Sequence, residues 1–145
     1  MISLLKEWWA GPNVVTRGKL HRADALPGFI AVQDSKPAGL ITYDIVGERC
    51  EIVTMNSLVE GKGIGSALID AVKSVAATAG CKRLWLITTN DNTNALHFYQ
   101  KRGFLLVAVH RNAIKKSRRL KPEIPLTGND GIPIRNEIEL EMMLS

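Results

Sequence analysis

The stretch CEIVTMNSLVEGKGIGSALIDAVKSVAATAG, residues 50–80, contains the change of hydrophobic period that decides the fold. Its first part, residues 50–59, is apolar and β-branched, which is typical of a strand. From Ile64 onward the apolar residues recur at helical spacing, and Gly80 is a suitable C-terminal cap. Between the two parts stand three glycines at alternate positions: Gly61, Gly63 and Gly65. The stretch therefore predicts a strand, a glycine loop and an amphipathic helix.

A glycine loop at the start of a helix is suited to binding an anion. The first amides of a helix have no partner within the helix, and the helix dipole favours negative charge at this end. Glycine also allows a ligand to approach the backbone closely. A plain turn is the alternative, but one or two glycines would be enough for it. The alternating glycines, followed by Ser66, favour a phosphate-binding loop.

Two common nucleotide-binding motifs fit this loop poorly. A P-loop would require GxxxxGK[ST], a spacing that does not occur here. A dinucleotide-binding loop would require G-x-G-x-x-G, but Ser66 occupies the place of the third glycine after Gly61 and Gly63. The next strand also ends in threonine, at Thr88 and Thr89, and not in an acidic residue.

The rest of the chain alternates between strand and helix patterns. Strands are predicted over residues 28–34, 38–47, 50–59, 83–89, 104–110 and 137–144. A second helix is predicted from the spacing of Ala95 and Tyr99, and it ends at Gly103. Residues 2–9 are expected to form one or two helical turns that stop before Pro12. The order β-β-β-α-β-α-β-loop-β predicts an α+β fold, a mixed α/β sandwich whose central strands are covered by helices.

Two segments carry additional expectations. Residues 83–89 are apolar on both parities, as in a strand that is covered on both faces. The segment between residues 110 and 137 is expected to lack regular structure. It contains several helix- and strand-breaking residues: Pro122, Pro125, Gly128, Gly131 and Pro133.

Length and composition indicate one ordinary globular domain over residues 1–145. The chain is 46% hydrophobic and 23% charged. No apolar run reaches the roughly 20 residues of a membrane span, and no signal peptide is apparent, so a cytoplasmic location without a membrane partner is expected. Cys50 and Cys81 form neither a disulfide framework nor a metal-ligand spacing, and the three histidines add no zinc motif. The cysteines are therefore predicted to be structural thiols, and no metal is expected.

The net charge of +5 is unevenly distributed. The run HRNAIKKSRRLK, residues 110–121, is rich in Lys and Arg and contains no acidic residue. Such a run suits phosphate-bearing or acidic partners, and the alternative is a solvated basic face. Few aromatic residues are interleaved with it, so a nucleic-acid partner is not favoured.

Two motifs together resemble those of the GNAT acetyltransferases. In that superfamily a strand is followed by [Q/R]-x-x-G-x-[G/A] and a helix, and residues 60–65 are similar except that Glu60 stands in place of Gln or Arg. A second block of the family, N-x-x-A-x-x-x-Y-x-x-x-G-F, is matched by NTNALHFYQKRGF, residues 92–104. The resemblance covers residues 28–110, and the segment after it is similar to that of a poorly characterised bacterial branch. The family's first strand is expected to be absent or shortened here.

The resemblance implies a fold, a co-substrate and a reaction. The sheet would be mostly antiparallel and splayed where acetyl-CoA binds. The chain would transfer acetyl from acetyl-CoA to a primary amine by direct attack in a ternary complex. Three sets of groups would hold the donor: the backbone of Val53, Thr54 and Met55 and the side chain of Asn92 at the pantetheine arm, and the amides of Gly61, Lys62, Gly63, Ile64, Gly65 and Ser66 at the pyrophosphate. Glu60 would point to water, and Lys62 would supply compensating charge.

Two catalytic residues follow from the same resemblance. An alkylammonium with a pKa of about 10 has to lose a proton before it attacks, and a thiolate with a pKa of about 8.5 leaves faster when it is protonated. Tyr99 matches the family's tyrosine that protonates the thiolate, or else it is a core tyrosine. Glu51 is similar in position to a glutamate base, or else it is an outward-facing strand residue. Glu137 and Asp91 are weaker candidates for the base, a relayed water is another, and Asp91 and Asn90 are expected to cap the second helix.

Other functions remain open from the sequence. A GNAT fold can bind acyl-CoA as a non-catalytic sensor, and a nucleic-acid-binding role of the basic run is a weaker alternative. The amine acceptor is not identified by any motif. The last strand and residues 111–135 are expected to offer an exposed edge and an arm, which would allow a homodimer.

Overall fold

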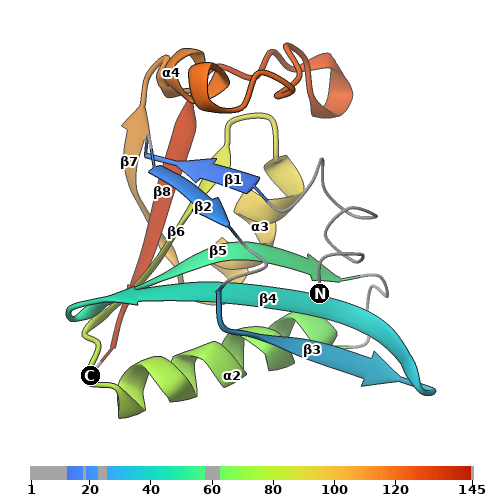
Figure 1. Ribbon diagram of the computed structural model, residues 1–145, viewed down its shortest axis with the longest axis vertical. Helices are drawn as coiled ribbons and strands as arrows, with labels where there is room; N and C mark the ends of the chain where they lie inside the picture. Colours follow the sequence, from blue (N-terminus) through green and yellow to red (C-terminus); the bar gives the residue numbers. More distant parts are fainter. Residues whose placement is uncertain (1–12, 18, 23–25, 58–62, 145) are drawn as a thin grey trace.

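The computed structural model describes residues 13–17, 19–22, 26–57 and 63–144, and these include a six-stranded sheet (Figure 1). In sheet order the strands are β3 (Gly28–Gln33), β4 (Lys36–Val46), β5 (Arg49–Ser57), β6 (Arg83–Thr89), β8 (Glu137–Met143) and β7 (Leu105–His110). All neighbours are antiparallel except β5 and β6, which are parallel. This architecture confirms the predicted α+β fold.

Strands β5 and β6 pair over only the first part of their length. The pairing runs from Arg49 opposite Arg83 to Ile52 opposite Leu86, although both strands continue beyond it. On its other edge β5 carries a bulge at Val53, because the register with β4 shifts at this point. Bulges bend a strand and increase its twist. The sheet therefore splays beyond Ile52 and Leu86, as predicted.

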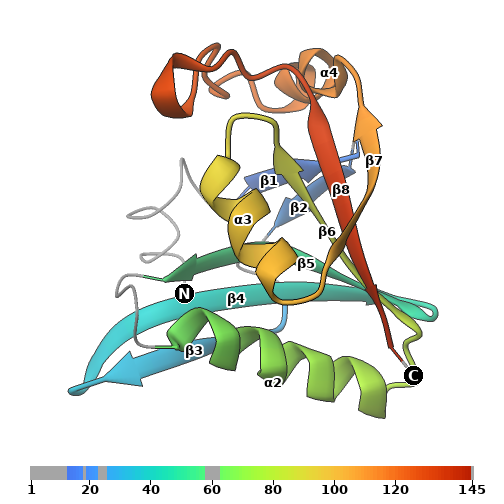
Figure 2. The same cartoon turned by 180° about the vertical axis from the view of Figure 1, so that it is seen from behind.

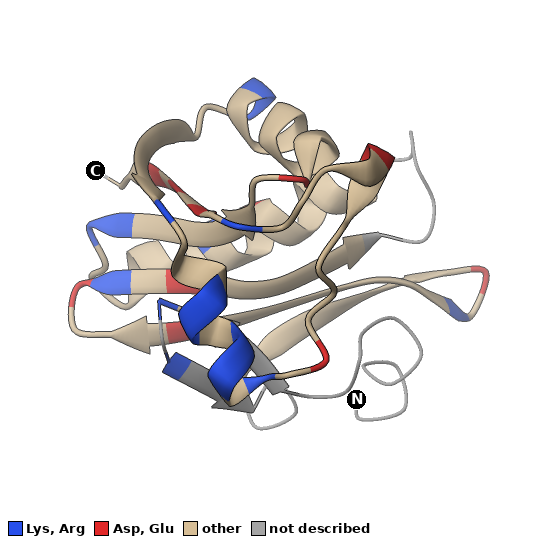
Figure 3. Ribbon diagram, turned by 90° about the horizontal axis from the view of Figure 1, so that it is seen from above, with Lys and Arg blue, Asp and Glu red and all other residues tan. Residues whose placement is uncertain are grey.

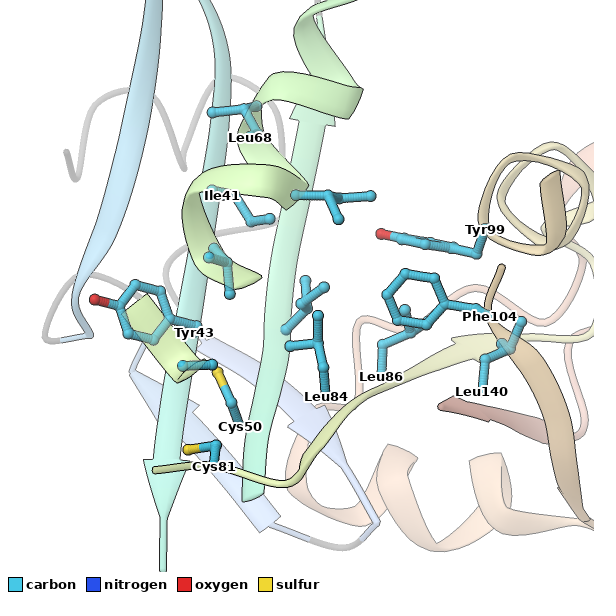
Figure 4. Packing of buried hydrophobic residues seen from close by; sticks show 14 of the residues in the cluster. Ile41, Tyr43, Cys50, Leu68, Cys81, Leu84, Leu86, Tyr99, Phe104 and Leu140 are labelled. Carbon is cyan, nitrogen blue, oxygen red and sulfur yellow. The ribbon is translucent and has the colours of Figure 1, made fainter. Parts of the chain in front are cut away.

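The two longer helices lie on the same face of the sheet (Figure 2). Helix α2 (Ile64–Thr78) covers β3, β4 and β5 and buries the predicted apolar face, including Leu68 and Val72. Helix α3 (Thr93–Lys101) places Tyr99 against Phe104, with the rings edge to face and their centroids 5.4 Å apart (Figure 4). Edge-to-face rings complement each other's charge distribution, so this pair fixes the end of α3 against the core.

The two cysteines belong to this core. Cys50 and Cys81 are free and buried among the side chains beneath α2 (Figure 4). Burial raises the pKa of the Cys50 thiol to about 12, with a further contribution from Cys81. A thiol of this kind is unreactive, which agrees with a structural role.

A short hairpin that the sequence analysis did not predict lies across the opposite face of the sheet (Figure 1). It consists of β1 (Asn13–Thr16) and β2 (Lys19–Arg22), joined by a turn in which Arg17 has a φ of 48°. The strands are too short to give a clear period-2 pattern. The predicted helix over residues 2–9 lies outside the described residues.

The segment between β7 and β8 contains helix α4 (Ala113–Leu120), so the prediction that it lacks regular structure was wrong in this part. All prolines and glycines of the segment come after residue 121 and do not interrupt the helix. Ile114 and Ser117 are buried, whereas most of the Lys and Arg side chains of the helix are exposed. Figure 3 marks these basic residues along the helix ribbon. The irregular part is held by Arg118, whose guanidinium donates to the carbonyls of Ile124, Pro125 and Ile134 at 3.3, 2.6 and 3.0 Å.

The order of the last strands corrects one further expectation, that the last strand offers an exposed edge. Strand β8 lies between β6 and β7 and is not an edge; the edge at this end of the sheet is β7, where Leu105, Leu106, Val107 and Val109 are exposed. A homodimer stays a prediction.

The expectation that β6 is covered on both faces holds only in part. The β6 residues that face the helices are buried, but Trp85 on the other face is only half-buried, so coverage of that face is incomplete. Within the described ranges, no helix combines the length and the apolar character that crossing a bilayer requires.

Candidate active site

A cavity of about 510 Å³ lies beside the end of β5, on the face of the sheet that carries the two longer helices. It is lined by Met55 and Asn56 of β5, by Gly63, Ile64 and Gly65 at the start of α2, and by Asn92, Asn94, Ala95, His97, Phe98, Tyr99, Lys101 and Arg102 of α3 and its ends. Most motif residues within the described ranges are therefore brought to one place, whereas Gly103 and Phe104 do not line the cavity. Glu60, Gly61 and Lys62 lie outside the described residues.

The start of α2 depends on two glycines. Gly63 has a φ of 71°, a left-handed conformation that side chains disfavour, and it stands at the N-cap without a side chain of its own. Gly65 is buried, and a Cβ there would come within 2.7 Å of the Phe98 ring. The two glycines allow α2 to begin directly against α3 at the cavity.

A cation is fixed beside this helix start. The Nε of Arg102 donates to Ser66 Oγ at 2.9 Å, and one of its terminal nitrogens donates to the carbonyl of Phe98 at 2.9 Å. The guanidinium also lies over the Phe98 ring, 3.5 Å from its centroid. Sequence reasoning missed Arg102, although its place directly before Gly103, within the second motif, was a usable signal. Ser66 thus contributes its hydroxyl to orienting this cation.

Tyr99 is buried, and its hydroxyl donates to Met55 Sδ at 3.4 Å. Its ring packs edge to face on Phe98 as well as on Phe104. Burial raises the pKa of Tyr99, and the nearby Arg102 only partly opposes this. The hydroxyl therefore stays protonated at neutral pH, as a proton donor must.

Asn92 is the residue that caps α3, with its Oδ1 accepting from the amide of Ala95 at 3.2 Å. The prediction that Asn90 and Asp91 cap this helix was wrong. Asn90 instead accepts from the amides of Arg135 and Asn136, both at 3.0 Å.

Asp91 also contacts the segment between α4 and β8. It accepts from the amide of Asn129 at 3.1 Å and from the Thr89 hydroxyl at 2.5 Å. A Cβ on Gly128 would lie 2.0 Å from its carboxylate, so the segment packs directly on it. Asp91 and Asn90 thus anchor the segment that follows α4.

The strand residues predicted to hold the donor take different orientations. Val53 is the bulge residue, and Met55 reaches the 510 Å³ cavity. The Thr54 hydroxyl lies 2.6 Å from that of Thr42 and is buried. The backbone of Val53, Thr54 and Met55 runs along the splay between β5 and β6.

A second cavity, of about 370 Å³, lies on the opposite face of the sheet. It is lined by Thr16, Arg17 and Lys19 of the hairpin and by Asp44, Val46, Arg49, Glu51, Arg83, Trp85 and Glu139 of the sheet. The hairpin therefore forms one wall of a charged pocket whose floor is the sheet.

Glu51 lines this second cavity and is only 6% exposed. Its side chain is therefore not exposed to solvent, as that of an ordinary outward-facing strand residue would be. The Thr16 hydroxyl donates to its Oε2 at 2.6 Å. Burial raises the pKa of Glu51 to about 7, against the lowering effect of the Thr16 hydrogen bond. A carboxylate with a pKa near neutrality can both accept and release a proton under working conditions.

Glu137 fixes the hairpin above Glu51. It is 1% exposed and accepts from the amide of Arg17 at 3.2 Å, from the Arg17 guanidinium at 3.4 Å and from the Ser117 hydroxyl at 3.5 Å. These contacts set the position of the neighbouring Thr16. Glu137 is consequently a clamp for the hairpin, and its carboxylate is already engaged on three sides. Among the described residues, no group of three or more His, Cys, Asp or Glu side chains is arranged to hold a metal ion.

Comparison with known proteins agrees with this geometry. Residues 3–104 match the Acetyltransferase (GNAT) family. The chain is 50% identical over 131 residues to the protein YdhI of Bacillus subtilis (strain 168), which is described as uncharacterized; the match covers 90% of this chain and 82% of that protein.

Solved structures of acetyltransferases share the fold. The IAA acetyltransferase of Bacillus cereus ATCC 14579 superimposes with a TM-score of 0.72 at 24% identity, covering 84% of this chain and 80% of that one. A GNAT family acetyltransferase of Elizabethkingia anophelis, with acetyl-CoA bound, superimposes with a TM-score of 0.69 at 25% identity, covering 79% and 74%. With the splayed sheet and the matching sequence motifs, these likenesses lead to one conclusion: the chain belongs to the acetyltransferase (GNAT) family.

Proposed function

We propose that this protein is an N-acetyltransferase, with residues 1–145 forming one domain, that moves acetyl from acetyl-CoA to a primary amine by direct attack. One observation carries the proposal. Beside the splay between β5 and β6, a cavity on one face of the sheet contains Tyr99 and a cavity on the other contains Glu51. A donor and an acceptor that approach from opposite faces would meet there. The acetyl-CoA bound to the Elizabethkingia anophelis neighbour also supports this donor.

The 510 Å³ cavity is suited to the donor. The backbone of Val53, Thr54 and Met55 would bind the pantetheine arm along the splay, with Asn92 beside it. The amides of Gly61, Lys62, Gly63, Ile64, Gly65 and Ser66 would bind the pyrophosphate. Helix starts favour anions, and Arg102 adds a charge-assisted donor at the same place.

The proposed chemistry needs proton transfers at both the nitrogen and the sulfur. Glu51, as the carboxylate, takes a proton from the acceptor's ammonium group. The nitrogen lone pair then attacks the thioester carbonyl carbon, the C–N bond forms, and the C–S bond breaks. Tyr99 gives its proton to the leaving sulfur. The nitrogen loses its second proton as the amide forms, and this proton restores the Tyr99 hydroxyl, while Glu51 releases its proton to solvent. The products are the acetamide, CoA with a free thiol and one proton. Proton transfers of this kind typically contribute about 10²–10⁴-fold each to a rate.

Two measurements test the proposal. Acetyl-CoA at about 100 times its Kd should raise the Tm by roughly 5–10 °C, because ligand binding adds about 2.7 kcal/mol to the stability of the native state. An oligonucleotide should leave the Tm unchanged. Release of CoA thiol on addition of a panel of amines, with mass spectrometry of the products, then separates transfer from sensing. Stabilisation without thiol release from any amine would indicate a sensor.

The Arg102→Gln variant is expected to raise the KM for acetyl-CoA by about 10–100-fold, since a hydrogen bond to a charged group is worth about 1.5–3 kcal/mol. The kcat should change little, because Arg102 would contact the phosphates and not the reacting carbon. Steady-state kinetics with a saturating acceptor measure both constants. Arg119→Gln, an exposed change on α4, is the matched control. An unchanged KM would remove Arg102 from the donor site.

A further inference from the structure

We infer that the acceptor is a small molecule that carries a carboxylate as well as its primary amine, as amino acids do, and that Arg49 binds this carboxylate in the 370 Å³ cavity. The inference rests on the proposed function and specifies its acceptor.

Arg49 and Glu51 are placed to bind two ends of one molecule. They are two residues apart on β5 and line the same cavity, so their side chains leave the same face of the sheet. Two residues of a strand span about 6.6 Å. Glu51 is one pair before the splay, opposite Trp85, whereas Arg49 is opposite Arg83 and farther from the splay. An amine at Glu51 would therefore direct the rest of the acceptor along β5 toward Arg49.

The charges of the cavity favour an anionic group at this end. Its described lining contains the cations Arg17, Lys19, Arg49 and Arg83 and the carboxylates Asp44, Glu51 and Glu139. Three of the cations have carboxylate partners: Arg83 pairs with Glu139 and Glu141, Lys19 with Asp44, and Arg17 with Glu137.

Arg49 differs from these three cations, because it forms no ion pair with any residue that the structure describes. A guanidinium presents its donors in a fork that matches a carboxylate. The charge of Arg49 would disfavour a second cationic group at this end of the acceptor. The side chains of Trp85 and Val46 offer apolar contact to a short carbon skeleton between the amine and the carboxylate.

The test compares acceptors that differ only at the carboxylate. Each amino acid of a panel is assayed beside its carboxamide and its decarboxylated amine, with saturating acetyl-CoA and thiol release as the readout. We expect kcat/KM to be at least about 10-fold higher for the acid than for the amide, as for a lost charge-assisted hydrogen bond. The amine of the carboxamide is less basic than the amine of the acid, so more of it is deprotonated and reactive at the same pH. This difference favours the amide, so a higher kcat/KM for the acid would be strong support for the inference.

Substitution of Arg49 assigns the preference to one residue. Arg49→Gln should reduce the ratio of kcat/KM for the acid and the amide to about 1, Arg49→Lys should retain part of it, and Arg119→Gln should leave it intact. Turnover that favours amines without an anionic group, or a ratio that Arg49→Gln does not change, overturns the inference and leaves the proposed function in place. If no amine of any kind releases CoA, the proposed function fails, and the inference fails with it.

Discussion

The Glu51→Gln variant is expected to lose roughly 10²–10⁴-fold in kcat/KM for the acceptor, the usual contribution of a general base. The loss should depend on pH. Burial raises the pKa of Glu51 to about 7, and only the carboxylate form can accept a proton. Wild-type kcat/KM should therefore rise through pH 7 on the acid side of its profile, and the variant should lack this rise.

Thermal unfolding gives a second readout for the same variant. The folded pKa of Glu51 is raised above the value of 4.5 for a free side chain, so its stabilising effect is present below pH 4.5 and is lost as the pH rises through 7. The difference in Tm between Glu51→Gln and wild type should grow in favour of the variant from pH 4.5 to pH 7 and then level off. Glu48→Gln, an exposed change in the adjacent turn, is the control. A variant that keeps the wild-type acid limb would show that the base is another group or a relayed water.

The Tyr99→Phe variant is expected to lose about 100-fold in kcat while its KM for acetyl-CoA changes little. A thiolate is a moderate leaving group, so the effect should lie at the lower end of general-acid contributions. The change removes one hydroxyl and leaves the ring contacts with Phe98 and Phe104 in place, so the fold should be retained. Single-turnover measurements with saturating substrates isolate the chemical step.

Tyr43→Phe is the matched control for this variant, because Tyr43 is a buried tyrosine that lines neither of the two cavities described above. The two variants should unfold at similar temperatures, but only Tyr99→Phe should be slow. Equal kcat values for Tyr99→Phe and wild type would leave Tyr99 a core residue only.

Most regular elements were predictable because their signals are local. The apolar spacing from Ile64 onward predicted α2, since a helix of this length buries one face whatever it packs against. The prediction missed helix α4 because it took the prolines after residue 121 to exclude regular structure from the whole segment. Proline restricts only its own backbone and that of the residue before it, so the helix before residue 121 is not affected. The cap of α3 was predicted wrongly because Asn90, Asp91 and Asn92 are all favourable N-cap residues. In the structure, Asn90 and Asp91 hydrogen-bond to the 121–136 segment, so Asn92 is the one that caps the helix.

The sequence by itself determined the order of elements, the glycine loop before α2 and the motif around Tyr99, because each of these depends on residues that are close along the chain. Only the tertiary structure decided the environment of Glu51. Its burial and its pKa depend on Thr16, which is 35 residues away in the sequence. They depend also on the hairpin, which is held by the contact of Arg17 with Glu137, two residues that are 120 apart. Desolvation and hydrogen bonding are set by whatever surrounds a group in space, and no local pattern around Glu51 contains that information.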